Sequence, residues 1–563
     1  MYNIIMQDAF TLYHTAAELD GILRGAKINR VSQPDKDDVY LLTYSKVGSR
    51  TLVLSANAEN CRVGFISKEK PNPKVAPNFC MLLRKHLLGA TIEKIELVGF
   101  ERIVRITFAC KNDFRENVVK IMYCEIMGKY SNLILTENGV ILGCLKNAPL
   151  DVATTRVTLS GAKYALPKPQ DKADIFDDEG LKERFLSYSG EEPPKFLFEN
   201  IKGLAYPSAA EAASVVFPFE SAEEGVKKLK EFILNPEICP NVCGEGKLKD
   251  VYITDYKTVG GEKKFYDLIS DATDDFYTKK ESDKAFALKQ KGLFDKVNGL
   301  IKKLGKKLQG ESEKILAASD SETLRLKGEL ITANLWKLNG GESECVLENY
   351  YDENKPVKIA LDKNLSPNQN AQRYFKKYAK EKRTLEIIIP QKEQTERELT
   401  YLQSVLLEIG QAAYISDFED IEEELISSGI TPPPKFRKKR TEETPYRVYN
   451  VFGYTVKCGK NNVQNDRLTG RAFKDDLWLH TKNYHSAHVI IETKGEGIPD
   501  NVIEAAAEIC AYYSDAKDGA KVPVDYTFKK FVKKPPQAKP GAVIYTDYKT
   551  AYVNPDRHEE FKV

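Results

Sequence analysis

The sequence has almost no charge excess and no long apolar run. Its 84 lysines and arginines nearly balance 82 aspartates and glutamates, which leaves a net charge of +2. A nearly neutral total excludes nothing about nucleic acid, because it can hide a strongly basic region. No apolar run reaches the roughly 18 residues that a membrane span needs. The opening residues lack a basic stretch and a small-residue cleavage site, so we expect a cytoplasmic protein without a signal peptide.

Common catalytic and nucleotide-binding motifs are also missing. The chain contains no GxxxxGK[S/T] loop, no GxGxxG after a strand, no GxSxG and no HExxH. No nucleophile lies beside a base at a spacing that suggests catalysis. We therefore expect no catalytic residues, no cofactor and no enzymatic activity of the chain itself.

Cysteines and histidines do not form a recognisable metal motif. Most of the ten cysteines lie in apolar segments and, without a secretion signal, are interpreted as reduced thiols. The close pair Cys239 and Cys243 lacks a second ligand pair. His480, His485 and His488 lie within nine residues of one another, but no carboxylate or cysteine partner accompanies them. We expect no metal.

Length and composition predict several globular domains. The chain has 563 residues, 42% apolar and 29% charged, and roughly 100–200 residues per domain gives three or four domains. The patterns predict a multidomain α+β fold: an N-terminal α+β domain, a small helical domain of hairpin type, a long antiparallel coiled coil and a C-terminal α+β domain. The expected boundaries are 1–170, 171–268, 269–430 and 431–563.

Two long charged stretches carry apolar residues at helical spacing. The first, from Asp271 to Leu338, repeats apolar residues at Leu293, Val297, Leu300, Leu304 and Leu308; the second, from Asn370 to Ile426, does so at Leu399, Leu402, Leu406 and Ile409. A turn-rich hairpin near 340–365 separates them. Two such helices joined at one tip form an antiparallel coiled coil. It is either a spacer or an arm that reaches a distant surface, and the sequence leaves both open.

Basic residues are concentrated near the end of the chain. From Lys435 to Lys539 there are 20 basic and 13 acidic residues, a net charge of 20 − 13 = +7. The run Lys435–Arg440 is either a solvated linker or part of this basic region. Such a concentration favours a nucleic-acid partner.

A polar segment from Gly459 to Thr469 lies in this region. Its charged and amide side chains suit contacts with phosphate, sugar and base edges, and Trp478 and Tyr484 could stack on bases. The alternative is a loop that satisfies its own backbone. The candidates are Lys460, Asn461, Asn462, Gln464, Asn465, Arg467, Arg471, Trp478, His480, Lys482 and His488.

Several segments resemble the NFACT family. The segments that resemble the family's C-terminal domain are Gly459–Thr469, Trp478–Lys482, Val524–Thr527 and Val532–Gly541. The segments that resemble its N-terminal domain are Phe79–His86 and Glu125–Asn132. Those that resemble its coiled coil are Gly328–Asn334 and Asn370–Lys377. The resemblance covers nearly the whole chain in the right order.

The resemblance implies a ribosome quality control factor. Such proteins bind the large (50S) ribosomal subunit and its 23S rRNA when the subunit carries a stranded peptidyl-tRNA. They recruit alanyl-tRNA and promote template-free alanine tailing, which marks the nascent chain for degradation, while the ribosome performs peptidyl transfer. The family also implies a small S4-like RNA-binding partner, RqcP. No residue reads as a selector for alanine.

The resemblance also carries over site residues. The residues that match the family's tRNA-binding positions are Asp8, Glu101, Arg102, Glu125, Met127, Gly128 and Lys129. Glu101 replaces the usual Asp, and we expect this acid to orient Arg102. In the C-terminal domain, His485-Ser486-Ala487 replaces the usual Pro-Gly-Ser before His488.

Two other classes of protein remain as alternatives. The family's older label suggests a surface adhesin that binds fibronectin, but no export or wall-sorting signal is recognised in the sequence. The N-terminal domain also distantly resembles formamidopyrimidine DNA glycosylases, whose nucleophile is an N-terminal proline amine. Tyr2 occupies that position here, so glycosylase chemistry is not supported.

Overall fold

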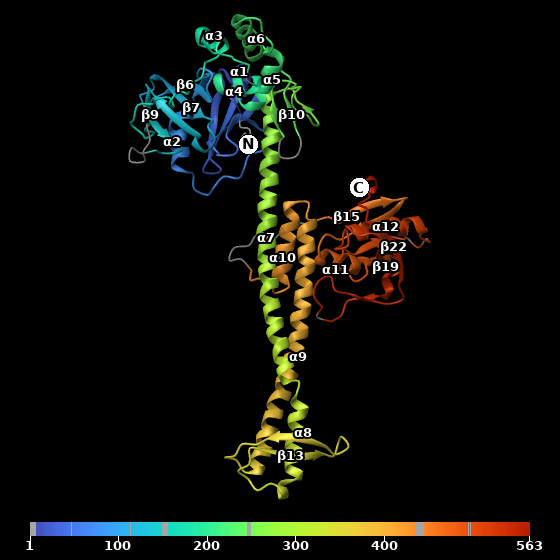
Figure 1. Cartoon of the computed structure of the whole chain (residues 1–563). Helices are drawn as coiled ribbons and strands as arrows, with labels where there is room; N and C mark the ends of the chain where they lie inside the picture. The colour runs from blue at the N-terminus through green and yellow to red at the C-terminus, as the bar shows by residue number, and fades with distance from the viewer. Residues whose placement is uncertain are drawn as a thin grey trace. The chain divides into compact units, whose positions relative to one another are not determined.

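The computed structural model describes residues 7–46, 48–112, 114–148, 156–190, 192–244, 249–433, 444–493, 495, 497–536 and 538–563 (Figure 1). The chain divides into two compact units, Met1–Asp283 and Lys284–Val563. Each unit combines helices with antiparallel sheets, so the expected multidomain α+β class is confirmed. The basic run Lys435–Arg440 and Tyr2 lie outside the described residues.

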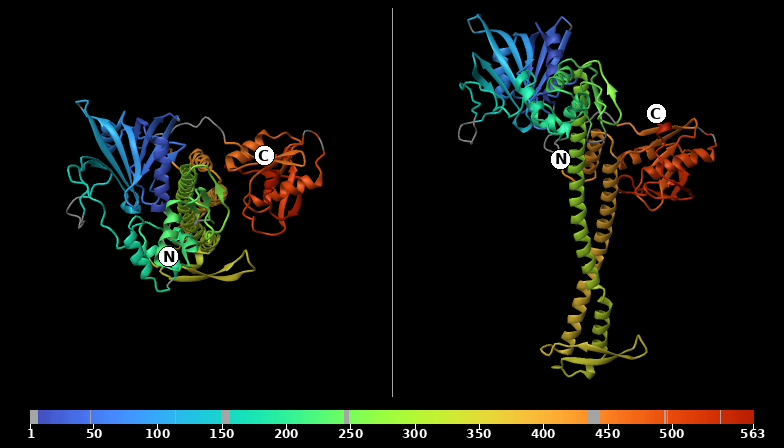
Figure 2. Two further views of the ribbon diagram at one scale, coloured as in Figure 1. Left: turned by 90° about the horizontal axis from the view of Figure 1, so that it is seen from above. Right: turned by 45° about the horizontal axis from the view of Figure 1, so that its top comes forward.

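The first unit contains a nine-stranded antiparallel sheet (Figure 2). Its order is β4-β3-β2-β1-β5-β6-β7-β8-β9. Helices α1 (Ala9–Leu23) and α2 (Asn78–Leu87) bury apolar side chains against it in one core. The strands are β1 (Lys27–Ser32), β2 (Asp38–Ser45), β3 (Gly48–Ser55), β4 (Arg62–Ile66), β5 (Thr91–Leu97), β6 (Ile103–Lys111), β7 (Asn117–Glu125), β8 (Asn132–Glu137) and β9 (Val140–Cys144).

A smaller group of helices completes the first unit. It contains α3 (Asp178–Leu186), α4 (Pro193–Asn200), α5 (Tyr206–Val216), α6 (Ala222–Leu234) and the short strands β10 (Asn241–Cys243), β11 (Asp250–Tyr252) and β12 (Lys264–Phe265). Its core includes Ala9 and Phe10 of α1. Gly203 has φ +79°, and a Cβ there would lie 2.4 Å from the Cβ of Ala9. A glycine is therefore needed where the turn before α5 meets α1.

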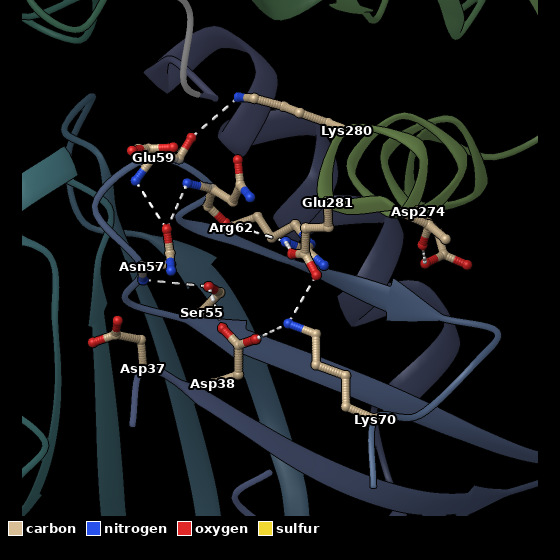
Figure 3. A network of polar contacts seen from close by, with 12 residues as sticks. Asp37, Asp38, Ser55, Asn57, Glu59, Arg62, Lys70, Asp274, Lys280 and Glu281 are labelled. Carbon is tan, nitrogen blue, oxygen red and sulfur yellow. Dashed lines mark hydrogen bonds and ion pairs between the residues drawn. The ribbon is translucent and has the colours of Figure 1, made fainter. Parts of the chain in front are cut away.

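The first turns of α7 (Ile269–Ala318) are fixed to the N-terminal sheet by a polar network (Figure 3). Glu281 pairs with buried Arg62 at 3.0 Å and with Lys70 at 2.8 Å. Lys70 also lies 2.8 Å from Asp38 on β2. Two turns earlier, Asp274 accepts hydrogen bonds from the backbone and hydroxyl of Ser67. These contacts hold the base of the helix to β2, β4 and the residues that follow β4.

The second unit contains the rest of α7 and the other long helices. The two continuous helices expected from the sequence are each interrupted: α7 ends at Ala318 and α8 spans Ser321–Ala333, while α9 (Pro367–Gln411) is followed by α10 (Ile415–Ser427). After α9, the backbone N–H groups of Ala413 and Tyr414 donate to the Asp417 carboxylate, each at 3.0 Å. This cap starts a new helix, and α10 packs with α7 and α9 in one core. Strands β13 (Glu344–Asn349) and β14 (Lys355–Ala360) form a hairpin between α8 and α9.

A six-stranded antiparallel sheet forms the end of the chain. Its order is β15-β16-β18-β17-β19-β22, and α12 (Asp500–Tyr512) covers one face in a core with these strands. Helix α11 (Asn462–Arg471) packs on the other side, where Leu468 contacts Trp478 and Ile490. The strands are β15 (Arg447–Val451), β16 (Tyr454–Cys458), β17 (Leu477–Thr481), β18 (Val489–Ile491), β19 (Val522–Phe528) and β22 (Lys549–Val553), with the separate pair β20 (Val532–Lys533) and β21 (Ile544–Tyr545).

Candidate nucleic-acid interface

Asp8 is a buried helix cap. Its Oδ1 accepts a hydrogen bond from the backbone N–H of Thr11 at 2.9 Å, which caps α1. Its Oδ2 accepts one from the backbone N–H of Ala205 at 3.1 Å, just before α5. The side chain predicted to contact tRNA therefore joins α1 to the smaller helical group instead.

Glu101 and Arg102 lie in the turn before β6, but the ion pair made by Glu101 is with Lys202. The two charged atoms are 3.5 Å apart, and Lys202 also lies 3.5 Å from Asp174. The expected role of Glu101 in orienting Arg102 is thus not what this geometry shows. Arg102 is half-buried, and within the described residues its guanidinium makes no hydrogen bond or ion pair. Its donors remain open to an external acceptor.

Glu125, at the end of β7, has no free carboxylate oxygen. The side chain is buried, and Arg156 donates to both oxygens at 2.5 and 3.0 Å. Tyr164 donates a third hydrogen bond at 3.0 Å. A carboxylate enclosed in this way is engaged within the fold, so in this conformation Glu125 offers no oxygen to tRNA.

The residues after Glu125 lie beside Arg102 and include a short 3-10 helix, Gly128–Tyr130. The backbone N–H of Ile126 donates to the carbonyl of Arg102 at 2.8 Å, which places the loop next to the start of β6. Met127 is half-buried and Gly128 is buried with φ +60°. Lys129 is exposed, with its ammonium 4.9 Å from the ring centre of Tyr130.

Tyr130 was missed by the sequence analysis, although it is 72% exposed. An aromatic residue beside a lysine is a signal that could have found it. The structure thus brings Arg102, Lys129 and Tyr130 to one end of the N-terminal sheet, where β6 begins and β7 ends.

The polar segment near Gly459 is the start of a helix and not a loop. Asn461 is the N-cap of α11 and accepts a hydrogen bond from the backbone N–H of Gln464 at 2.8 Å. Gln464 in turn accepts one from the backbone N–H of Lys460 and donates to Thr444. These amides are buried and satisfy the helix terminus, so their predicted contacts with RNA do not fit.

The other two amides of α11 join separate segments of the second unit. Asn462 donates to Ser404 on α9 at 2.9 Å and to Glu424 on α10 at 3.1 Å. Asn465 accepts a hydrogen bond from the backbone N–H of His488 at 3.0 Å. Both side chains are buried. They lock α11 to its neighbours and are not available to a ligand.

Trp478 is fully buried, so the predicted stacking of its ring on a base is wrong for this structure. It stacks on His480 at 5.6 Å between ring centres and meets His488 edge-on at 5.3 Å. Burial lowers the pKa of His480 to about 3 and that of His488 to about 4. Both imidazoles are therefore neutral near pH 7 and supply no charge to a phosphate.

The basic candidates differ in how far they reach solvent. Lys460 is mostly buried, 3.6 Å from Asp417. Arg467 is half-buried and Arg471 is exposed at the end of α11. Lys482 is partly exposed, 3.7 Å from Asp525, and its ammonium lies 4.9 Å from the ring centre of Tyr548. Of these four, Arg471 and Lys482 present charge at the surface.

A cleft of about 1200 Å³ lies within the second unit, between α9 and the C-terminal domain. His480, His485 and Lys539 line one side. The wall formed by α9 is mainly acidic and contributes Glu393, Glu396 and Glu398 against Arg397. Phosphate groups are repelled by such a wall, so the cleft is a poor site for an RNA backbone.

Two buried carboxyl groups lie where α9, α10 and α11 meet. Burial raises the pKa of Glu424 from 4.5 to about 7, and it raises that of Glu408 well above its ordinary value. Tyr401 donates to Glu424 at 2.8 Å, and Asn462 donates to the same oxygen. These hydrogen bonds favour the ionised form of Glu424, but burial outweighs them. The pair is therefore sensitive to pH.

The described residues contain neither a cluster of metal-binding side chains nor a helix that could span a membrane. In the part of the chain that the structure describes, no group of three or more His, Cys, Asp or Glu side chains could hold a metal ion. Among the described helices, none is both long and apolar enough to cross a bilayer.

Comparisons with known proteins cover almost the whole chain. The family model of the NFACT N-terminal and middle domains matches residues 8–444, and the model of the NFACT protein RNA binding domain matches residues 445–547. The chain is similar to Rqc2 homolog RqcH of Bacillus subtilis, with 33% identity over 99% of both chains. It is 32% identical to Rqc2 homolog RqcH of Streptococcus suis over 99% of this chain and 100% of that one.

A solved structure matches about half of the chain. The N-terminal part of the fibronectin/fibrinogen-binding protein from Streptococcus suis has 27% identity and a TM-score of 0.44, and the match covers 49% of this chain and 100% of that one. The two family models together span residues 8–547. The chain belongs to the NFACT family.

Proposed function

We propose that the protein is a cytoplasmic ribosome quality control factor. It binds stalled large (50S) ribosomal subunits that carry peptidyl-tRNA, recruits alanyl-tRNA and promotes alanine tailing of the nascent chain. Peptidyl transfer is left to the ribosome, and the chain is not itself an enzyme. The observation that carries the proposal is the similarity over 99% of the chain to proteins named as Rqc2 homologues.

At the residue level, the proposal assigns tRNA contact to the end of the N-terminal sheet where β6 begins and β7 ends. Arg102 has no partner among the described residues, while Lys129 and Tyr130 are exposed beside it. A guanidinium can make paired hydrogen bonds to phosphate or a base edge, and an exposed tyrosine can stack on an unpaired base. Asp8 and Glu125 have structural roles instead, because their carboxylates are already paired within the fold.

The other partners follow from the same proposal. The C-terminal domain, matched by the NFACT RNA-binding model, contacts 23S rRNA. An S4-like RNA-binding protein of the RqcP type acts with it on the subunit. Neither role needs a cofactor or a metal.

Sedimentation with ribosomal subunits tests the proposal. The purified protein is mixed with free large subunits and, as a control, with free small subunits, and is then sedimented over a series of salt concentrations. We expect sedimentation with the large subunit at low salt and release as salt rises, because phosphate contacts release counterions. Failure to sediment with large subunits at any salt concentration would overturn the proposal, and binding to immobilised fibronectin in place of subunits would favour the adhesin alternative.

A further inference from the structure

Three strands of the C-terminal sheet bring distant residues into one row. The backbone N–H of Lys482, just after β17, donates to the carbonyl of Pro523 on β19 at 2.9 Å. Pro523 is paired with Tyr552 on the edge strand β22. The neighbours Val522, Val524 and Val553 face the core under α12. Because side chains alternate along a strand, Lys482 and Tyr552 share the opposite face (β19 and β22 in Figure 1).

Lys482 is held in place by a buried acid. Asp525 is 1% exposed and also accepts hydrogen bonds from Thr550 at 2.6 Å and Tyr545 at 2.9 Å. Although burial alone lowers the pKa of Lys482, Asp525 and Tyr548 raise it above its ordinary value. The ammonium therefore stays charged, and its side chain is 36% exposed. It is a fixed positive charge at the surface.

Two exposed tyrosines flank this charge. Tyr552 is 70% exposed on the edge strand, and Tyr548 is 44% exposed with its ring under the Lys482 ammonium. Tyr548 is steadied by edge contact with Tyr545 at 5.3 Å. Large exposed rings beside a cation make a platform on which a flat, electron-rich group can stack.

The surrounding chain is strongly basic. Residues 529–549 contain six lysines and one aspartate, a net charge of 6 − 1 = +5. Two of these lysines already have partners: Lys534 forms an ion pair with Asp466, and Lys539 donates a hydrogen bond to the carbonyl of Ser428. Exposed positions in the same stretch include Lys530, Lys533 and Lys549. The field around the tyrosines therefore attracts a polyanion.

We propose that Lys482, Tyr548 and Tyr552 form a binding site for an unpaired RNA nucleotide. Lys482 contacts the phosphate, and the base stacks on Tyr552. An unpaired nucleotide fits better than a duplex, because the faces of paired bases are covered by their neighbours. The site deepens the proposed function and rests on it for the expectation that the ligand is RNA.

Binding of a fluorescent ten-nucleotide oligouridylate to the full-length protein tests this site. The variants are Tyr552→Ala, Tyr552→Phe and Lys482→Met. Tyr44→Ala is the matched control, since Tyr44 is 58% exposed on β2, a strand of the N-terminal sheet. We expect Tyr552→Ala to weaken binding about five- to a hundredfold and Tyr552→Phe to bind as the parent does. Lys482→Met should reduce the slope of log affinity against log salt by about one.

The outcomes separate this site from the proposed function. If the parent sediments with large subunits but Tyr552→Ala and Lys482→Met bind the oligonucleotide as tightly as the parent, the site is wrong and the proposed function stands. If oligonucleotide binding depends on Tyr552 but the parent does not sediment with subunits, the site stands and the proposed function is wrong. Equal or tighter binding of an RNA duplex, with no dependence on Tyr552, would also overturn the site.

Discussion

Arg102 and Glu125 lie at the same end of the N-terminal sheet, where β6 begins and β7 ends, but their surroundings give them opposite roles. Glu125 is enclosed by Arg156 and Tyr164. Arg102 has no partner among the described residues. The family pattern marks both positions, but a sequence cannot show that a carboxylate 31 residues from an arginine is already paired with it. Burial and pairing decide which charge meets a ligand.

Arg102→Ala should abolish recruitment of tRNA while binding to the large subunit persists. The guanidinium offers open donors in a fixed fork at this end of the sheet, and alanine offers none. The measurement is tRNA sequencing after pull-down of the variant with stalled subunits. Arg24→Ala is the control, because Arg24 is exposed just after α1 and pairs with Asp20. Unchanged recovery of tRNA from the Arg102 variant would remove this residue from the interface.

Glu125→Ala should lower the free energy of unfolding by about 3 kcal/mol, because it leaves the Arg156 charge without its partner. Arg102→Ala should leave stability nearly unchanged. Chemical denaturation of both variants gives the comparison. If Glu125→Ala unfolds at the same denaturant concentration as the parent, the paired carboxylate does not support the fold as described here.

At the scale of elements, α11 shows which features of a helix can be predicted from a sequence pattern and which cannot. Polar density suggested a binding loop, whereas the segment is a capped helix with buried amides. Asn461 followed three residues later by Gln464 is a capping pattern and could have predicted the helix start. The partners Ser404 and Glu424 could not be predicted, because they come from α9 and α10. Likewise, the long helices follow from apolar spacing, but the breaks after Ala318 and Gln411 do not.

Glu424→Gln should stabilise the second unit increasingly as pH rises from about 4.5 to about 7. The raised pKa means that the folded parent holds a proton which the unfolded chain releases in this range, so the parent loses stability as pH rises. Glutamine keeps an acceptor for Tyr401 without this loss. The difference in unfolding free energy should reach at most about 3 kcal/mol. A difference that stays constant across this pH range would contradict the assignment.

The hairpin between α8 and α9 should contribute to subunit binding. Trp336, Val346 and Tyr351 are exposed around it, which is an unusual concentration of apolar surface for a turn. Replacing residues 350–354 with a short Gly-Ser turn should keep the fold, because α8 and α9 have their own shared core. Sedimentation with large subunits should weaken. Full binding after this replacement would make the long helices a spacer.

At the scale of the whole molecule, the order of segments was readable from the sequence. Motifs in each part resemble one family, and the family models match the chain from residue 8 to residue 547. The nucleotide site proposed on the six-stranded C-terminal sheet could not be predicted from the sequence. Lys482 and Tyr552 are 70 positions apart and come together only through the register of the strands. Long-range pairing of this kind carries no local sequence signal.

The most direct test of the central claim is the RNA recovered with the protein from cells in which ribosomes stall. Tagged parent protein is purified through sedimentation, and the RNA in the large-subunit fraction is sequenced. We predict 23S rRNA without matching small-subunit rRNA, together with alanine tRNA enriched over other tRNAs. Recovery of neither large-subunit rRNA nor enriched tRNA, from protein that remains folded and full-length, would contradict a role in ribosome quality control.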